Sequence, residues 1–137
     1  MGLKDKKLIS LKEIEGTIST HDGFVKREMQ RRQDALEYVE DVIGLAEYIG
    51  GEVVNLGLRE DWAVKKAIFL GIEIVFVFNR ADEEFTSNLR VLYAGERVRK
   101  IHGEDLAEIT IACVNHMLRY VRETNSDKEL PEICYKV

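Results

Sequence analysis

The chain contains two cysteines and three histidines, the side chains best suited to metal binding or nucleophilic catalysis. Cys113 and His116 are three residues apart, so a helix would bring them to one face, where Cys134 could complete a zinc site. However, the sequence has no paired Cys-x-x-Cys spacing, and Cys113 lies within an apolar stripe, which is typical of a packed core cysteine. The same setting argues against Cys113 as a nucleophile with His116 or His21 as its base. We therefore predict no metal site, no cofactor and no catalytic residue.

Charged residues form two clusters that could bind a small group. The acidic run 82–84 could hold a cation or perform acid–base chemistry, although consecutive acids in a loop are usually solvated. Arg27, Arg31 and Arg32 are the anion-binding candidates, because like charges four residues apart repel unless an anion lies between them. A net charge of -5 and the lack of exposed aromatic residues beside these arginines argue against a nucleic-acid partner.

Arg59, Asp61 and Trp62 are the candidates for binding a small ligand. The chain has a single tryptophan, and a tryptophan at a loop–strand junction beside charged residues can form the wall of a pocket. The alternative is that Trp62 lies at the edge of the core. No loop suited to phosphate binding is present, because Gly50-Gly51 follows a predicted helix and precedes a predicted strand, the reverse of the required order.

The stretch from Gly71 to Asn79 must organise the elements that position these residues. At a period of two, Ile72, Ile74, Phe76 and Phe78 point one way, and Val75 and Val77 point the other way. A strand that is apolar on both faces is typical of the centre of a sheet covered on both sides. If the two long helices cover one face, the N-terminal segment or a second subunit must cover the other. We therefore predict a homodimer.

Hydrophobic periodicity predicts the remaining elements. A long helix runs from about Asp22 to Ile49, and a second from about Glu104 to Glu123. Strands are predicted at 52–58, at 62–70 and in a hairpin with arms 89–93 and 97–101. The stretch 62–70 could instead form a helix capped by Asp61. A short helix around 4–18, with Ser10 as its cap and Gly16 as its end, precedes these elements, and the alternating tail 133–137 could follow a sheet edge or a neighbouring subunit.

Charge divides along the first long helix. Basic residues are concentrated in its first half and acidic residues in its second half: Lys26, Arg27, Arg31 and Arg32, then Asp34, Glu37, Glu40, Asp41 and Glu47. This order opposes the helix dipole, which favours acids at the N-terminus and bases at the C-terminus. An antiparallel copy of the same helix would pair the two halves, and the alternative is a solvated face of mixed charge.

The length of 137 residues predicts one domain (1–137), with a mobile N-terminal segment (1–20) and a C-terminal tail (124–137). Hydrophobic residues make up 45% and charged residues 33%, which indicates a globular chain; the high charge with only two glutamines resembles a thermophile composition. The charged start Met1 to Lys7 does not resemble a signal peptide, so we expect a reduced cytoplasmic protein without membrane association.

The fold class predicted is α+β, with a long N-terminal helix, an antiparallel sheet of about four strands and a long C-terminal helix. The leading functional hypothesis is a non-enzymatic homodimeric interaction or scaffold module, because no reactive constellation stands out. One alternative is a small-molecule-binding or sensing domain with a helix–sheet pocket near Trp62. The other is a small hydrolase that uses His21 or His116 with nearby carboxylates.

Overall fold

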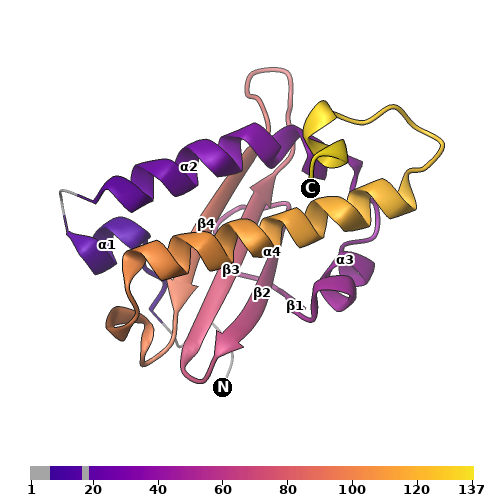
Figure 1. Ribbon diagram of the computed structural model, residues 1–137. Helices are drawn as coiled ribbons and strands as arrows, with labels where there is room; N and C mark the ends of the chain where they lie inside the picture. The colour runs from indigo at the N-terminus through magenta and orange to yellow at the C-terminus, as the bar shows by residue number, and fades with distance from the viewer. Residues whose placement is uncertain (1–6, 17–18) are drawn as a thin grey trace.

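The computed structural model describes residues 7–16 and 19–137 as an α+β fold, in which helices lie across one face of an antiparallel sheet (Figure 1). The sheet has four strands in the order β1-β2-β3-β4. In chain order the elements are α1 (Leu11–Glu15), α2 (Thr20–Arg32), the 3-10 helix η2 (Gln33–Tyr38), α3 (Val42–Ile49), β1 (Glu52–Val54), β2 (Trp62–Phe69), β3 (Ile72–Asn79), β4 (Asn88–Ala94), η3 (Val98–Lys100), α4 (Gly103–Thr124) and η4 (Glu132–Tyr135).

The predicted central strand is confirmed as β3, which pairs with β2 on one side and β4 on the other. Ile74, Phe76 and Phe78 are fully buried and belong to the large core that the helices cover. The C-terminal helix is confirmed as α4, whose two apolar stripes pack into that core. The strand interpretation of 62–70 is also confirmed as β2, so the alternative helix is wrong.

The second face of β3 is covered by the chain itself. Val75 and Val77 have no exposed surface, and they form a smaller core with Ala63 and Ala94. Leu8, from the segment before α1, and Leu56, from the connection between β1 and β2, pack against this cluster; the connection crosses behind the sheet in Figure 1. A second subunit is therefore not needed to bury this face, and the argument for a homodimer from β3 alone fails.

The predicted long N-terminal helix is wrong, because 22–49 is divided into α2, η2 and α3. After α2 the chain tightens into the 3-10 turn of η2, and Val39 is then extended. Asp41 starts α3 as its N-cap, accepting a hydrogen bond from the Gly44 backbone N–H at 3.0 Å. The break allows Leu36, within η2, and Val39, directly after it, to enter the core.

This division also removes the conflict between the charges and the helix dipole. Arg31 and Arg32 occupy the last turn of α2, and Asp22 lies in its first turn. Bases at the C-terminus and acids at the N-terminus are the favourable arrangement. The acids from Asp34 to Asp41 lie beyond the end of α2, so no split-charge helix exists to pair with a second copy.

The second arm of the predicted hairpin is also different, because 97–101 contains η3 and no strand. Gly95 has φ 115°, and a Cβ there would lie 2.1 Å from the Gly71 carbonyl oxygen. This close approach lets the Arg97 N–H donate to the same carbonyl at 2.9 Å, which turns the chain away from the sheet. Consequently β4 is an edge strand.

The first and last described segments pack against β4 and the helical layer. Ser10 caps α1 and Gly16 follows it, as predicted, and Ile9 pairs with Tyr93 of β4. The C-terminal tail forms η4 and does not follow a sheet edge; the Arg122 guanidinium donates to the Cys134 and Val137 carbonyls at 3.0 Å. The parts of the predicted N-terminal segment at 1–6 and 17–18 lie outside the described residues. No helix in the described ranges is both long enough and apolar enough to span a membrane.

Candidate docking surfaces

The three small-ligand candidates lie on two sides of the sheet. Asp61 and Trp62 are consecutive, so their side chains point to opposite faces. Trp62 belongs to the helix-covered core and stacks on Phe78 with ring centroids 5.0 Å apart. Its buried Nε1 has no hydrogen-bond partner among the described residues. None of the four hollows considered below is lined by Trp62, whereas Arg59 and Asp61 line the same one.

That hollow, which we call the arginine depression, has a volume of about 570 Å³ and contains Arg59, Arg80 and Arg90. Its two carboxylates accept hydrogen bonds from backbone amides: Asp61 accepts from the Arg80 N–H at 2.6 Å, and Asp82 accepts from the Glu84 and Phe85 N–H groups.

The three arginines of the depression are not equally available. The Arg80 guanidinium donates to the Val39 carbonyl at 2.8 Å and to the Glu37 carbonyl. Arg59 and Arg90 are exposed and make no ion pair with another described residue. Burial raises the pKa of Glu60, but backbone N–H groups and the more distant Arg90 outweigh this effect and lower it. The depression therefore presents two arginine side chains to solvent.

The three anion-binding candidates do not act as a cluster. Arg32 is only 5% exposed, and its Nε donates to Asn115 Oδ1 of α4 at 2.9 Å. Arg31 and Arg32 both donate to the Glu28 carboxylate. Partial burial raises the pKa of Glu28, but these hydrogen bonds outweigh it and hold the pKa below its ordinary value. Arg27 stays on the exposed side of α2, so the structure does not bring the three guanidinium groups to one anion.

The two cysteines and His116 do not form a metal site or a catalytic site together. Cys113 and Cys134 are free and buried, and burial raises the pKa of both thiols. His116 packs against the Tyr48 ring with centroids 4.9 Å apart, and burial lowers its pKa. Within the described ranges, no three histidine, cysteine or carboxylate side chains form a group that could hold a metal ion.

His21 has a carboxylate partner, Glu15, with 2.6 Å between Nδ1 and Oε2. Ser19 donates its hydroxyl to the other oxygen of Glu15 and also caps α2 by accepting from the Asp22 N–H. The serine therefore bonds the carboxylate and not the imidazole, whereas a serine nucleophile requires its base within hydrogen-bond reach. This arrangement is typical of a capping cluster.

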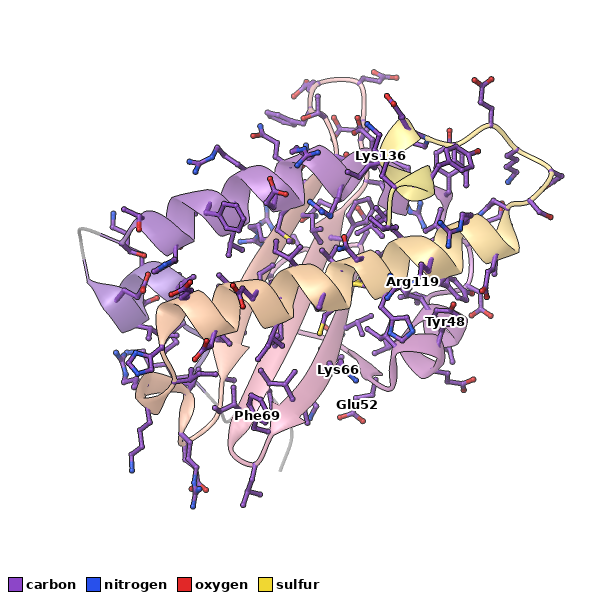
Figure 2. All side chains as sticks on the ribbon, viewed as in Figure 1. Tyr48, Glu52, Lys66, Phe69, Arg119 and Lys136 are labelled. Atoms are coloured by element: carbon purple, nitrogen blue, oxygen red, sulfur yellow. The ribbon has the colours of Figure 1, made fainter. Side chains whose placement is uncertain are left out.

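The end of the β2–β3 hairpin is a surface feature that the sequence pattern did not indicate. Leu70 is 80% exposed and Phe69 is 54% exposed. Two hollows flank them, one of about 580 Å³ beside Ile101 and Ile109 and one of about 770 Å³ beside Ala67 and Gly95. The hairpin end projects beyond α4 at the bottom of Figure 1, and Figure 2 shows Phe69 there. The string Ile68-Phe69-Leu70 reads as core in the sequence, so only the tertiary position reveals its exposure.

A groove of about 480 Å³ between α2 and the outer edge of β4 is a second surface feature that the sequence pattern did not indicate. Its floor is apolar and includes Val25, Met29, Val91 and Tyr93, and Gln30 of α2 and Gln33 of η2 also line it. The predicted hairpin would have filled this edge with the arm 97–101. The groove therefore depends on that arm turning away from the sheet.

Residues 3–116 match the family described as "Domain of unknown function (DUF3786)". Comparison with curated proteins and with solved structures gave no match.

Proposed function

The chain belongs to the DUF3786 family, and we propose that it is a non-enzymatic interaction module that forms a homodimer through the end of the β2–β3 hairpin. The observation that carries this proposal is an exposed apolar projection beside an apolar hollow on the same surface. Leu70 and Phe69 form the projection, and Ile72, Ile101 and Ile109 line the hollow. Large side chains exposed together mark interaction sites more often than single exposed ones do.

A projection beside a hollow suits a two-fold interface. In such an interface the same surface is used by both subunits, so a residue at one position meets a different position on the partner. Leu70 of one subunit would enter the hollow of the second, and the second Leu70 would enter the hollow of the first. Because the projection and the hollow lie side by side, one rotation satisfies both contacts.

The charged side chains around the hollow are arranged as a two-fold interface requires. Arg97 and Lys100 lie in and before η3, while Asp105 and Glu108 lie in the first turns of α4. All four are exposed, and none makes an ion pair with another residue in the described ranges. A two-fold rotation would place the basic pair of one subunit against the acidic pair of the other, which supports association and fixes its orientation.

Two complementary charge variants test the proposal. Variant A carries Arg97→Glu and Lys100→Glu, and variant B carries Asp105→Lys and Glu108→Lys. In each variant alone, all four charged side chains around the hollow have the same sign. Two copies of the same variant would repel each other there, so we expect each variant to be a monomer. An equimolar mixture should form an A–B heterodimer, because each hairpin end then meets its opposite. Native mass spectrometry and light scattering distinguish the three samples.

The control is a pair of substitutions of the same kind away from the hairpin end. Glu132→Lys and Lys136→Glu reverse an exposed ion pair on η4 and should leave the dimer unchanged. Leu70→Glu should give a folded monomer. A wild-type chain that is monomeric at all accessible concentrations would refute the homodimer, and so would a dimer that variants A, B and Leu70→Glu leave intact.

A further inference from the structure

We propose that the groove between α2 and β4 binds an acidic polypeptide segment in extended conformation, which adds as a fifth strand to the edge of β4. The segment would run antiparallel to β4, and its carboxylates would follow into the arginine depression. This site is separate from the hairpin end and is independent of the proposed homodimer.

The chain already uses this edge once for strand pairing. Ile9 and Tyr93 form an antiparallel bridge, with the Tyr93 N–H donating to the Ile9 carbonyl at 2.8 Å and the reverse bond at 2.9 Å. The Tyr93 N–H and carbonyl therefore point away from β3. Because backbone direction alternates along a strand, Val91 and Leu89 point their N–H and carbonyl groups to the same outer edge.

Of the outer-edge groups beyond Tyr93, those of Val91 are available. Neither the N–H nor the carbonyl of Val91 has a partner on this side among the described residues. The Leu89 N–H is bonded only by the Gln33 side chain, at a long 3.3 Å. An exposed edge of this kind is a template for another strand, and proteins usually block it with proline, lysine or a covering element. Residues 88–94 contain neither proline nor lysine.

The chain does not continue along this edge after Ile9. Ser10 begins α1 with a capping box, in which its N–H donates to Glu13 and its hydroxyl accepts from the Glu13 N–H. The cap turns the backbone out of the strand direction directly after the bridge. The edge at Val91 is thus left to a second segment, which would continue the line that Ile9 begins and would displace the Gln33 side chain from the Leu89 N–H.

The groove has the form that an added strand requires. Val25, Met29 and Tyr93 form the base of the groove but are at most 5% exposed, so the partly buried Val91 offers the segment its apolar contact. Main-chain hydrogen bonds would supply the affinity, and the alternate side chains would supply the specificity.

Charge selects the acidic segment. The groove continues into the arginine depression, since Thr86, Asn88 and Arg90 line both. Asp61 and Asp82 accept hydrogen bonds from backbone N–H groups there, whereas Arg59 and Arg90 are exposed and make no ion pair with a described residue. At the other end, Lys26 is already paired with Asp22 at 3.0 Å. An antiparallel segment reaches the depression with its C-terminal part, so its carboxylates belong at that end.

The probe is a fluorescein-labelled peptide, Thr-Val-Thr-Val-Thr-Glu-Asp-Glu, measured by fluorescence anisotropy with the full-length chain. We expect binding in the micromolar range and an affinity at least about tenfold lower for the peptide with lysines in place of its three acids. Amide resonances of Val91 and Leu89 should shift in a two-dimensional NMR titration. Equal binding of the acidic and basic peptides, or shifts confined to other surfaces, would overturn the proposal.

Methylation of backbone nitrogens tests the strand pairing itself. Methyl groups on one alternate set of the Thr-Val amides should weaken binding by about fivefold or more, and methyl groups on the other set should leave it unchanged. Equal effects of the two sets would exclude an added strand. Arg59→Gln with Arg90→Gln should remove the preference for the acidic peptide, while Lys136→Gln on η4 should not.

The same peptide binds a monomer if the two surfaces are independent. We expect Leu70→Glu, the variant that disrupts the hairpin end, to bind the acidic peptide with the affinity of the wild-type chain. Loss of the homodimer with retained peptide binding would confirm two separate surfaces. If this variant keeps its fold but loses peptide binding, the groove is not a complete binding site in one chain, and the proposal is wrong.

Discussion

The contact between α2 and α4 and the end of the β2–β3 hairpin both combine charged and apolar side chains, but they treat the charges in opposite ways. At the helix contact, Arg32 is almost fully buried and its guanidinium is bonded by Glu28 and Asn115. At the hairpin end, four charged side chains surround an apolar hollow and none is paired with another described residue.

The difference between the two regions shows how a charged residue that stabilises the fold can be distinguished from one that is available for binding. A charge that finds its partner within the chain has been used to specify the fold, because burial without that partner would be costly. Charges that stay unpaired beside exposed apolar surface are available to another molecule. The arginine triplet of α2 attracted a functional interpretation in the sequence, yet Arg32 is structural. The hairpin end attracted none, yet it has the stronger features of an interface.

The largest contrast between the two regions should come from leucine truncation. Leu118→Ala on α4 removes a fully buried side chain and should reduce the free energy of unfolding by about 2–5 kcal/mol. Leu70→Ala at the hairpin end should change it by less than about 0.5 kcal/mol in the monomer. Urea unfolding in the background of variant A, where the dimer is expected to be absent, measures both. A large cost for Leu70→Ala would mean that the hairpin end belongs to the core.

Arginine truncation at the helix contact should give the next largest effect. Arg32→Ala leaves Glu28 and Asn115 without a buried partner, and we expect it to lower the free energy of unfolding by about 2–4 kcal/mol. Arg31→Ala is the matched control, because Arg31 binds the same carboxylate from an exposed position and should contribute about 0.5 kcal/mol. Similar costs for the two variants would contradict the structural role of Arg32.

Acid should weaken the helix contact through Glu28. The pKa of Glu28 is lowered in the folded chain, so its contribution to stability is complete above the ordinary value of 4.5 and is lost as the pH falls through the folded pKa. We expect the wild type to lose more unfolding free energy than Glu28→Gln between neutral and acidic pH. Glu15 and Glu60 also have lowered pKa values, so the variant keeps part of the slope. Identical pH profiles would exclude the contribution of Glu28.

Neutralising a charge at the hairpin end should have the smallest effect on stability. Glu108→Gln should leave the free energy of unfolding within about 0.5 kcal/mol of the wild type, because the side chain is exposed and unpaired within the described chain. Its effect should appear in association, as a weaker dimer whose dissociation responds less to salt. Sedimentation equilibrium at several salt concentrations measures this. A marked loss of monomer stability would assign Glu108 to the fold.

Local patterns predicted the elements whose signals are complete within a short stretch. The double apolar face of 72–78 predicted β3, and the stripes of 104–123 predicted α4. Ser10 and Gly16 predicted the limits of α1, because capping involves neighbours only a few residues away. The long N-terminal helix failed because Asp41 begins a new helix and Arg32 finds Asn115 on α4, a partner that is 83 residues away in the chain.

The amino-acid pattern indicated an α+β chain built on a central apolar strand, because side-chain alternation along a strand is a local property. Which surfaces remain open depends on the tertiary structure. It covers Val75 with Leu8 and Leu56, turns 97–101 away from the edge of β4, and leaves Leu70 in solvent. Each outcome depends on contacts between segments that are distant in the sequence. The identity of an apolar residue does not show whether such a segment covers it.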